Sequence, residues 1–565
     1  MLGRLGVAMS VSRAVVALCV TALLAGSCSS GSGSSGSGSS SEDDVERLTI
    51  AVPLDVGPLG LFGGPSARFK DPAVLLVYDK LLAPSPYVDD PQPWLAEAVS
   101  PLDPLTWEVT VRQDVEWHDG QPFSAEDVAF TFDYFRAAGV TGRYTHHVIQ
   151  VPEIASVEVV SPRVVRFTCA YPCPELGPVT LADLPIIPRH VWEGVNEPAK
   201  DTRLPVGTGP YRLVEYSGTK GYRFEANAGY FAGSPTVDEL VMPVIEDPST
   251  AFTALRTGEI DATAHTVAPE LLEQFRAEDG LDVVTTSPLQ FTELVLKVEH
   301  ELWTDHYARR AVSLAIDREE LLETVVLGQG RPATRGYPHP DSPWTSPDLS
   351  TPTDPAEAEA VLDGLGWVDR DGDGVRETPE GRPVRFELMV ASTEPTHLRA
   401  AQLVAEQLEA VGMAPVVRPL DPGSVSGLIT SRQFDAMVRS ISAHGVADPT
   451  QFVQSHLSEV GYLWKDGLPY PELEALLAEW RAAGTLDARR RALFRIQDLH
   501  NRQPASIPLY YPDEHWAVRA GAFGGWVESP SFGIVHKWSF LPPGVGRDAN
   551  ATAVRPARRE AVPGS

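Results

Sequence analysis

Short segments in which apolar and polar residues alternate, or in which β-branched residues are dense, mark the first part of this chain. The segment 48–52 is rich in β-branched residues, and 106–111 alternates along its length, which predicts two β-strands. The segments 157–160 and 164–167 flank a Ser-Pro pair and predict a β-hairpin. We therefore expect a first part that is rich in strands and turns.

The pattern changes near residue 350, where helical spacing of apolar residues begins to take turns with strand patterns. In chain order we expect a helix over 356–365, a strand at 384–390, a helix over 398–411, strands at 416–417 and 435–441, and helices over 471–483 and 487–501. An apolar run at 507–511 follows. Alternation of strand and helix predicts an α/β arrangement for this second part.

The composition excludes two classes of protein. Of the 565 residues 43% are hydrophobic, and twelve are tryptophans that need burial, so the chain as a whole is not intrinsically disordered. Lys and Arg total 46 against 76 Asp and Glu, which gives a net charge of −30. No nucleic-acid partner is expected, because binding to phosphates needs a cationic surface.

The first 27 residues have the pattern of an export signal. Arg4 and Arg13 precede an apolar run over 14–24, which is too short to cross a membrane, since a spanning helix needs about 20 apolar residues. Small residues and then Cys28 follow, and Leu24–Cys28 resembles a bacterial lipobox, in which the cysteine is lipidated. The alternative is ordinary cleavage and an inert cysteine.

Residues 28–46 extend the pattern of an anchored, exported protein. Only Ser and Gly occur over 29–41, and three acidic residues follow, so this tether is a flexible coil with a span of roughly 20 Å. An acidic body is repelled by anionic lipid, and we expect the lipid on Cys28 to hold it at the outer face of the cytoplasmic membrane. Residues 543–565 are polar and rich in Pro, Ala and Arg, and we expect a disordered tail there.

Two further cysteines, Cys169 and Cys173, lie at the end of the predicted hairpin. An oxidising compartment permits a disulfide between them. A metal site is the weaker alternative, because the nearby sequence supplies neither a second cysteine pair nor a histidine to complete four ligands. We expect a local disulfide.

Four segments of the chain match family signatures. They are 107–133, 205–211, 254–261 and 309–318. Together, and in this order, they resemble the family 5 solute-binding proteins of ABC importers, which include dipeptide-, oligopeptide- and nickel-binding proteins. The resemblance extends over about 47–542.

The resemblance implies a mixed α/β (α+β) fold of two lobes, similar to type II periplasmic binding proteins of cluster C, with an extra subdomain. We expect lobe I to comprise 47–270 and about 500–542, with the subdomain inserted at about 62–200. Lobe II is then expected over 271–500. We expect the ligand to lie between the lobes, which close around it.

Three features of the matched segments have architectural explanations. His118 is interpreted as a partly buried histidine bonded within its own turn rather than a catalytic base or metal ligand. Ser124 and Asp127 resemble a capping box that begins a helix. Gly207–Pro210 lacks the lysine of a phosphate loop, and we interpret it as a crossing between lobes.

The ligand contacts follow from the resemblance. Peptide-binding members hold the peptide's ammonium group with a carboxylate that precedes an acidic-Pro pair. Asp448 and Pro449 fit that pair, but His444 or Gly445 stands in place of the carboxylate. This replacement argues against a free peptide N-terminus, and His444 would suit a metal chelate or an anionic group. An exposed loop histidine is the alternative.

Other ligand contacts are expected from two segments. Arg331 and Arg335, next to Tyr337, lie where peptide binders bring an arginine to the ligand carboxylate, a role that suits the bidentate guanidinium. An arginine that faces solvent is the alternative. Phe62 and Phe291 are candidates for apolar walls of the cleft, with core packing as the alternative.

A separate motif occupies 369–380. Asp369, Asp371, Asp373 and Glu380 have the spacing of a calcium loop. A predicted strand follows instead of an exit helix, and similar Asp/Gly turns occur in the resembled family without metal. We expect no cofactor, with structural Ca²⁺ at this loop as the alternative.

These features favour a lipid-anchored, monomeric receptor that captures a peptide or another small solute and delivers it to an ABC permease. It would perform no chemistry. A sensor of a non-peptide solute, such as a metal chelate, a sugar or a cell-wall fragment, is the second hypothesis. A lipoprotein hydrolase is the weakest, because the sequence has neither a G-x-S-x-G nor an H-E-x-x-H motif.

Overall fold

The computed structural model describes residues 45–58, 61–62, 72–84, 91–137, 153–287, 290–334, 336, 339–442, 471–528 and 533–546. Residues 43–565 form one compact unit. The predictions for the export signal, Cys28, the Ser/Gly tether and the chain beyond 546 concern residues outside these ranges, so they stay predictions.

The first sheet is built around β1 (Val45–Ala51). Leu48 and Ile50 are buried, and β1 pairs in parallel with neighbours on both sides, as an apolar central strand does. The strand order is β12-β19-β11-β1-β10-β9-β8. The other six strands are β8 (Tyr211–Ser217), β9 (Gly221–Ala226), β10 (Val237–Met242), β11 (Ala262–Thr266), β12 (Leu281–Thr286) and β19 (Glu514–Arg519). Two short helices, α6 (Pro248–Thr257) and α7 (Leu272–Arg276), pack beside β11 and β12, and η3 (Pro269–Leu271) packs against α7.

The second sheet is built around β13 (Gln290–Leu296), in which every residue after the first is buried. Its order is β14-β18-β13-β17-β15-β16. The other strands are β14 (Gly330–Pro332), β15 (Arg385–Ala391), β16 (Ala414–Leu420), β17 (Ala436–Ser442) and β18 (Ser506–Pro512). Because β15 pairs in parallel with both β16 and β17, the α/β alternation predicted for this part of the chain is present.

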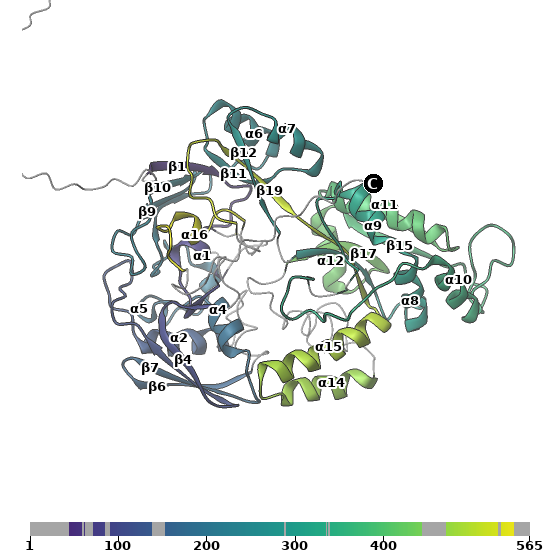
Figure 1. The fold of residues 1–565 in the computed structure, drawn as a ribbon, viewed down its shortest axis with the longest axis horizontal. Coiled ribbons are helices and arrows are strands. Elements are labelled where there is room, and N and C mark those ends of the chain that lie inside the picture. The colour runs from purple at the N-terminus through teal and green to yellow at the C-terminus, as the bar shows by residue number, and fades with distance from the viewer. Residues whose placement is uncertain are drawn as a thin grey trace, which may run out of the picture. The chain divides into compact units, whose positions relative to one another are not determined.

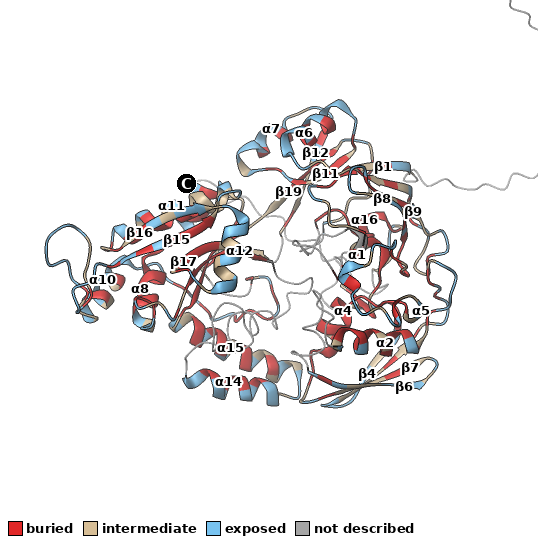
Figure 2. Cartoon of the chain, turned by 180° about the vertical axis from the view of Figure 1, so that it is seen from behind, coloured by how far each residue is buried: buried red, intermediate tan, exposed pale blue. Residues whose placement is uncertain are grey.

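Helices surround the second sheet; the four predicted at 356–365, 398–411, 471–483 and 487–501 agree in bounds to within three residues, and three more among the described residues were not predicted. In chain order the helices are α8 (His306–Ala315), α9 (Arg318–Val325), α10 (Pro355–Gly364), α11 (Pro395–Glu409), α12 (Pro422–Ser431), α14 (Pro471–Ala482) and α15 (Leu486–Arg502). Figure 2 shows that buried residues concentrate in the sheets and on the sides of the helices that face them, as amphipathic helices require.

A four-stranded antiparallel sheet, ordered β4-β5-β7-β6, forms the extra subdomain. Its strands are β4 (Ala96–Asp103), β5 (Thr106–Val111), β6 (Ile154–Ser161) and β7 (Val164–Cys169), and β6 with β7 is the predicted hairpin. The neighbouring elements are α1 (Pro72–Val77), β2 (Leu82–Ala83), β3 (Gln92–Pro93), α2 (Ala125–Arg136), η1 (Leu176–Thr180), α4 (Leu181–Asp183), α5 (Arg189–Trp192) and η2 (Pro198–Lys200).

The two larger sheets define two lobes, and the chain passes between them twice (Figure 1). It leaves the first sheet after Thr286 and enters the second at Gln290, and it returns between Pro512 and Glu514. The predicted boundaries at 270/271 and 500 are each misplaced by one strand. The reason is long-range pairing, which joins β12 to β19 and β18 to β13.

Candidate functional site

Three side-chain hydrogen bonds link the two crossings between the lobes. Thr285 Oγ1 and His515 Nδ1 are 2.9 Å apart. Trp516 Nε1 donates to Thr286 Oγ1 at 3.3 Å, and Gln290 Nε2 donates to Glu514 Oε1 at 2.9 Å. The crossings are therefore tied side by side, which is the arrangement of a two-segment hinge.

One predicted ligand-contact loop begins at the hinge end of the second sheet, after β17, and the other begins a few residues from that end, after β14. Pro332 lies level with Tyr510, Tyr510 with Thr292, and Thr292 with Ser440. The predicted contacts follow directly after β14 and β17. Arg335, Tyr337, His444 and Asp448 themselves lie outside the described residues and stay predictions.

Arg331 lies within β14 and is described. Its guanidinium forms an ion pair with Asp341, and both side chains are about half exposed. A surface pair of this kind contributes little to stability. This contact favours the solvent-facing interpretation of Arg331.

Phe62 and Phe291 are buried in core clusters. Phe62 is 4% exposed and lies among Tyr134, Phe135 and Trp192, with ring centroids 4.7–5.8 Å away. Phe291 is 1% exposed and its ring faces Tyr511 at 5.9 Å. Their described contacts support core packing, the alternative to the cleft wall, because rings in such clusters bury nearly all of their surface.

The loop over 369–380 brings four carboxylates together, but the fourth is not the predicted Glu380. Oxygen atoms of Asp369, Asp371, Asp373 and Glu377 lie within 4.8 Å of one another. Glu380 instead accepts a hydrogen bond from Thr378 at 2.8 Å. Backbone bridges of Glu377 to Val368 and to Pro383 turn the chain back at this point. The prediction that Glu380 joins the three aspartates is therefore wrong, and Glu377 takes that position. Calcium at this loop stays a prediction.

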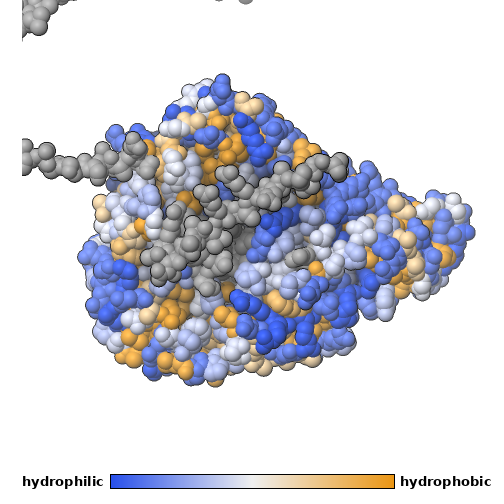
Figure 3. All heavy atoms as spheres, viewed as in Figure 1, coloured by the Kyte–Doolittle hydropathy of each residue, from blue (hydrophilic) through white to orange (hydrophobic). Residues whose placement is uncertain are grey.

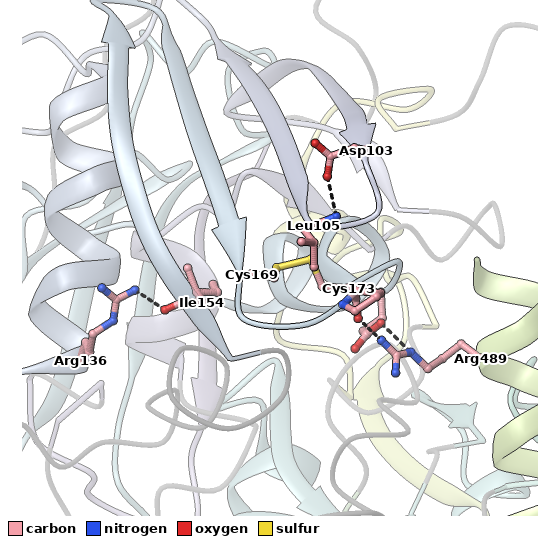
Figure 4. Close-up of a disulfide and its surroundings, with 9 residues drawn as sticks. Asp103, Leu105, Arg136, Ile154, Cys169, Cys173 and Arg489 are labelled. Atoms are coloured by element: carbon pink, nitrogen blue, oxygen red, sulfur yellow. Dashed lines mark hydrogen bonds and ion pairs between the residues drawn. A yellow bond between two sulfur atoms is a disulfide. The ribbon is translucent and has the colours of Figure 1, made fainter. Parts of the chain in front are cut away.

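Cys169 and Cys173 are joined by a disulfide at the end of β7 (Figure 4). Backbone bonds hold this turn, since Cys169 N–H donates to Leu105 O at 2.9 Å and Cys173 N–H to Pro104 O at 3.0 Å. This pairing confirms the local disulfide predicted from the sequence. Both cysteines are buried, so the bond lies inside the subdomain.

His118 connects two of the four matched segments. Its Nε2 donates to Gly209 O at 2.9 Å, and its Nδ1 accepts from Gly207 N–H at 3.3 Å. Burial lowers the pKa of His118 to about 4, because the charged imidazolium is desolvated. Its partners lie outside its own turn, which corrects the prediction, and Gly207–Pro210 lies within the first lobe rather than at a crossing.

Asp79 and Lys537 form a buried ion pair that no motif or spacing in the sequence predicted. Lys537 Nζ lies 2.9 Å from Asp79 Oδ1 and 4.2 Å from the centroid of the Trp94 ring. Trp94 Nε1 and Tyr230 OH also donate to the carboxylate, at 2.8 Å and 3.0 Å. The group fastens α16 (Lys537–Phe540) to the first lobe. Its members come from distant parts of the sequence.

No helix within the described part of the chain is both long and apolar enough to cross a membrane.

Comparisons with known proteins agree with this architecture. A family model of bacterial extracellular solute-binding proteins, family 5 Middle, matches residues 90–463. The oligopeptide-binding protein AppA of Bacillus subtilis (strain 168) is 27% identical over 451 residues, which cover 75% of this chain and 79% of that protein. The chain belongs to the family 5 extracellular solute-binding proteins.

Solved structures show the same two-lobed fold. AppA from Bacillus subtilis in complex with a nonapeptide matches with a TM-score of 0.73 and 22% identity, and covers 88% of this chain and 99% of that one. NikA from Brucella suis in complex with Fe(III)-EDTA matches with a TM-score of 0.76 and 24% identity, and covers 88% and 99%. The predicted fold class and family, the solute-binding component of an ABC importer, are confirmed.

Proposed function

We propose that this protein is a lipid-anchored receptor that captures a peptide or peptide-like solute between its two lobes and delivers it to an ABC permease. The observation that carries the proposal is the family match over 90–463 on a chain whose two sheets are joined by two crossings. A relative with this fold is named as an oligopeptide-binding protein. Closure about the hinge would enclose the solute.

Native mass spectrometry of the mature protein with a tryptic casein digest tests solute capture. We expect adducts of peptide mass that survive buffer exchange and that raise the melting temperature, because a ligand that binds only the folded state stabilises it. No adduct with the digest, and none with small molecules from a cell extract, would contradict the proposal.

The chemical class of the solute is suggested by His444 or Gly445, which stands where peptide-binding members have a carboxylate. Without an acidic partner a buried ammonium group is costly, so we propose that the solute lacks a free amino terminus at this position. The digest and its N-acetylated form should then bind about equally. A strong preference for free amino termini would favour an ordinary peptide receptor.

The membrane anchor is proposed from Cys28 and the tether. Cys28→Ser should release the protein from the membrane fraction while leaving peptide binding unchanged, because the acyl groups supply the attachment. If Cys28→Ser stayed in the membrane fraction as fully as the parent, the proposed anchor would be contradicted, and the proposed solute binding would be unaffected. The monomeric state is checked by the mass of the same sample.

A further inference from the structure

Arg489 joins the two lobes at a place distant in sequence from both crossings. It lies in α15 of the second lobe, and its Nε is 3.0 Å from Glu175 Oε2 of the extra subdomain. Both side chains are 0% exposed. The same guanidinium donates to the carbonyl oxygen of Pro172 in the subdomain and to that of Trp480 in α14. One side chain therefore bonds to both sides of the interface.

Packing around the pair also spans the interface. Val179 of the subdomain belongs to the same buried cluster as Trp480 and Leu493 of the second lobe. The Arg489 guanidinium lies 4.4 Å from the centroid of the Trp480 ring. The ion pair is thus enclosed by apolar and aromatic side chains from both lobes, which exclude water from it.

The contact lies on the side of the body away from the hinge. In Figure 1 the crossing strand β19 runs along the upper side, whereas α14 and α15 meet the subdomain at the lower side. Figure 3 shows hydrophilic atoms over the lower right of this face, where α15 lies. A contact opposite a hinge forms and breaks with domain closure.

The disulfide holds the segment that receives Arg489. Pro172 and Glu175 flank Cys173, whose bond to Cys169 fastens the segment to the end of β7. Figure 4 shows Arg489 reaching from its helix toward this turn. The acceptor carbonyl and carboxylate are therefore fixed before the helix arrives, and preorganisation of this kind lowers the entropy lost on contact.

We propose that Arg489 and Glu175 form a closure latch, a buried ion pair that assembles when the lobes close and sets how long they stay closed. The inference rests on the proposed function, in which closure holds the solute. A charge pair suits a latch because both groups regain water when the lobes part. If the lobes closed without bringing the two groups together, the closed state would bury an unpaired charge. Arg489 and Glu175 act as positioning residues and need not touch the solute.

Distance measurements between spin labels test the latch. Nitroxides on genetically encoded acetylphenylalanine, at exposed positions 159 in β6 and 475 in α14, report closure and leave the cysteines untouched. Samples are measured with and without the casein digest, together with the dissociation rate of bound peptides. We expect Arg489→Met to reduce the short-distance population and to raise the dissociation rate about tenfold.

Three further variants separate the latch from general destabilisation. Arg495→Met breaks the exposed pair between Arg495 and Glu479 on the same two helices and should change neither readout. Arg489→Met with Glu175→Met removes both charges and keeps the protein folded if the single variant is unstable. Its dissociation should stay faster than that of the parent. Cys169→Ala with Cys173→Ala should broaden the short-distance population.

The outcomes are distinguishable. Equal distance distributions and dissociation rates in the parent and in both Arg489 variants would overturn the latch. So would a parent protein that never shows the short distance, with or without digest. A parent that shows the short distance but binds no peptide would overturn the proposed function and leave the latch standing.

Discussion

At the scale of single residues, His118 shows how a polar side chain in a family signature can be structural. Both ring nitrogens are occupied by backbone groups of Gly207 and Gly209. A neutral imidazole can donate with one nitrogen and accept with the other, so this geometry needs the uncharged form. The ring therefore fixes one matched segment against another.

A pH dependence follows from this burial. The pKa of folded His118 is lowered from 6.5 to about 4, so the unfolded chain binds the proton first as pH falls. Stability is complete above pH 6.5 and declines toward pH 4. Between pH 7 and pH 4.5 the free energy of unfolding should fall in both the parent and His118→Asn. The fall in His118→Asn should be smaller by about 2.5 kcal/mol.

Urea unfolding at the two pH values measures this difference. His339 and His536 also have pKa values lowered to about 4 by burial. The parent should therefore lose stability through the protonation of all three histidines, and His118→Asn removes the part that is due to His118. His190→Asn, at a side chain that is 37% exposed, is the control for the substitution of a histidine by asparagine as such. An equal loss in the parent and in His118→Asn would show that His118 titrates alike in both states.

The Asp79–Lys537 pair marks the limit of prediction at this scale. Lysine and aspartate are usually exposed, and nothing in their local sequence distinguishes these two from surface residues. Their burial arises because α16 brings Lys537 across 458 positions of sequence to Asp79. Only the folded chain creates that environment.

At the scale of elements, local pattern was a good guide. The strand predicted at 106–111 is β5 (Thr106–Val111), and the helix predicted over 356–365 is α10 (Pro355–Gly364). Asp127 Oδ2 accepts from Ser124 N–H at 2.9 Å, one arm of the predicted capping box. Such features depend on residues within a few positions of one another, so the sequence contains their cause.

Glycines 207 and 209 place the 205–211 segment against α1. A Cβ on Gly207 would lie 1.9 Å from Val77 O, far inside van der Waals contact. Gly207→Ala should therefore lower the free energy of unfolding by about 1–3 kcal/mol or more, as overpacking does. Gly364→Ala in α10 is the matched control, since nothing lies within 4 Å of the added Cβ and alanine favours a helix.

Chemical denaturation of both variants checks this. We expect Gly364→Ala to be neutral or more stable than the parent, and Gly207→Ala to be less stable. If Gly207→Ala were as stable as the parent, the 205–211 segment would not pack closely on α1.

At the scale of the whole molecule, the two lobes have separate cores. One cluster includes Leu48 and Trp117 of the first lobe, and another includes Leu294 and Trp303 of the second. Separate cores allow separate unfolding. In calorimetry of the solute-free protein we expect a calorimetric enthalpy larger than the van't Hoff enthalpy. Under the proposed function a bound peptide contacts both lobes, so saturation with it should merge the transitions. A single two-state transition without ligand would contradict this.

The sequence by itself determined the family, through its resemblance to known signatures, and the acidic character of the body, through its composition. It also determined those strands and helices, such as β5 and α10, that depend on local apolar spacing. Tertiary structure decided where the lobes divide. β12 belongs to the first sheet and β18 to the second because each pairs with a strand more than 200 positions away. It also decided that Glu377 rather than Glu380 faces the aspartates, and that Arg489 meets Glu175. The division of the lobes and the Arg489–Glu175 pair depend on contact between distant segments, which no local pattern encodes. The position of Glu377 depends on how the chain turns back within one loop.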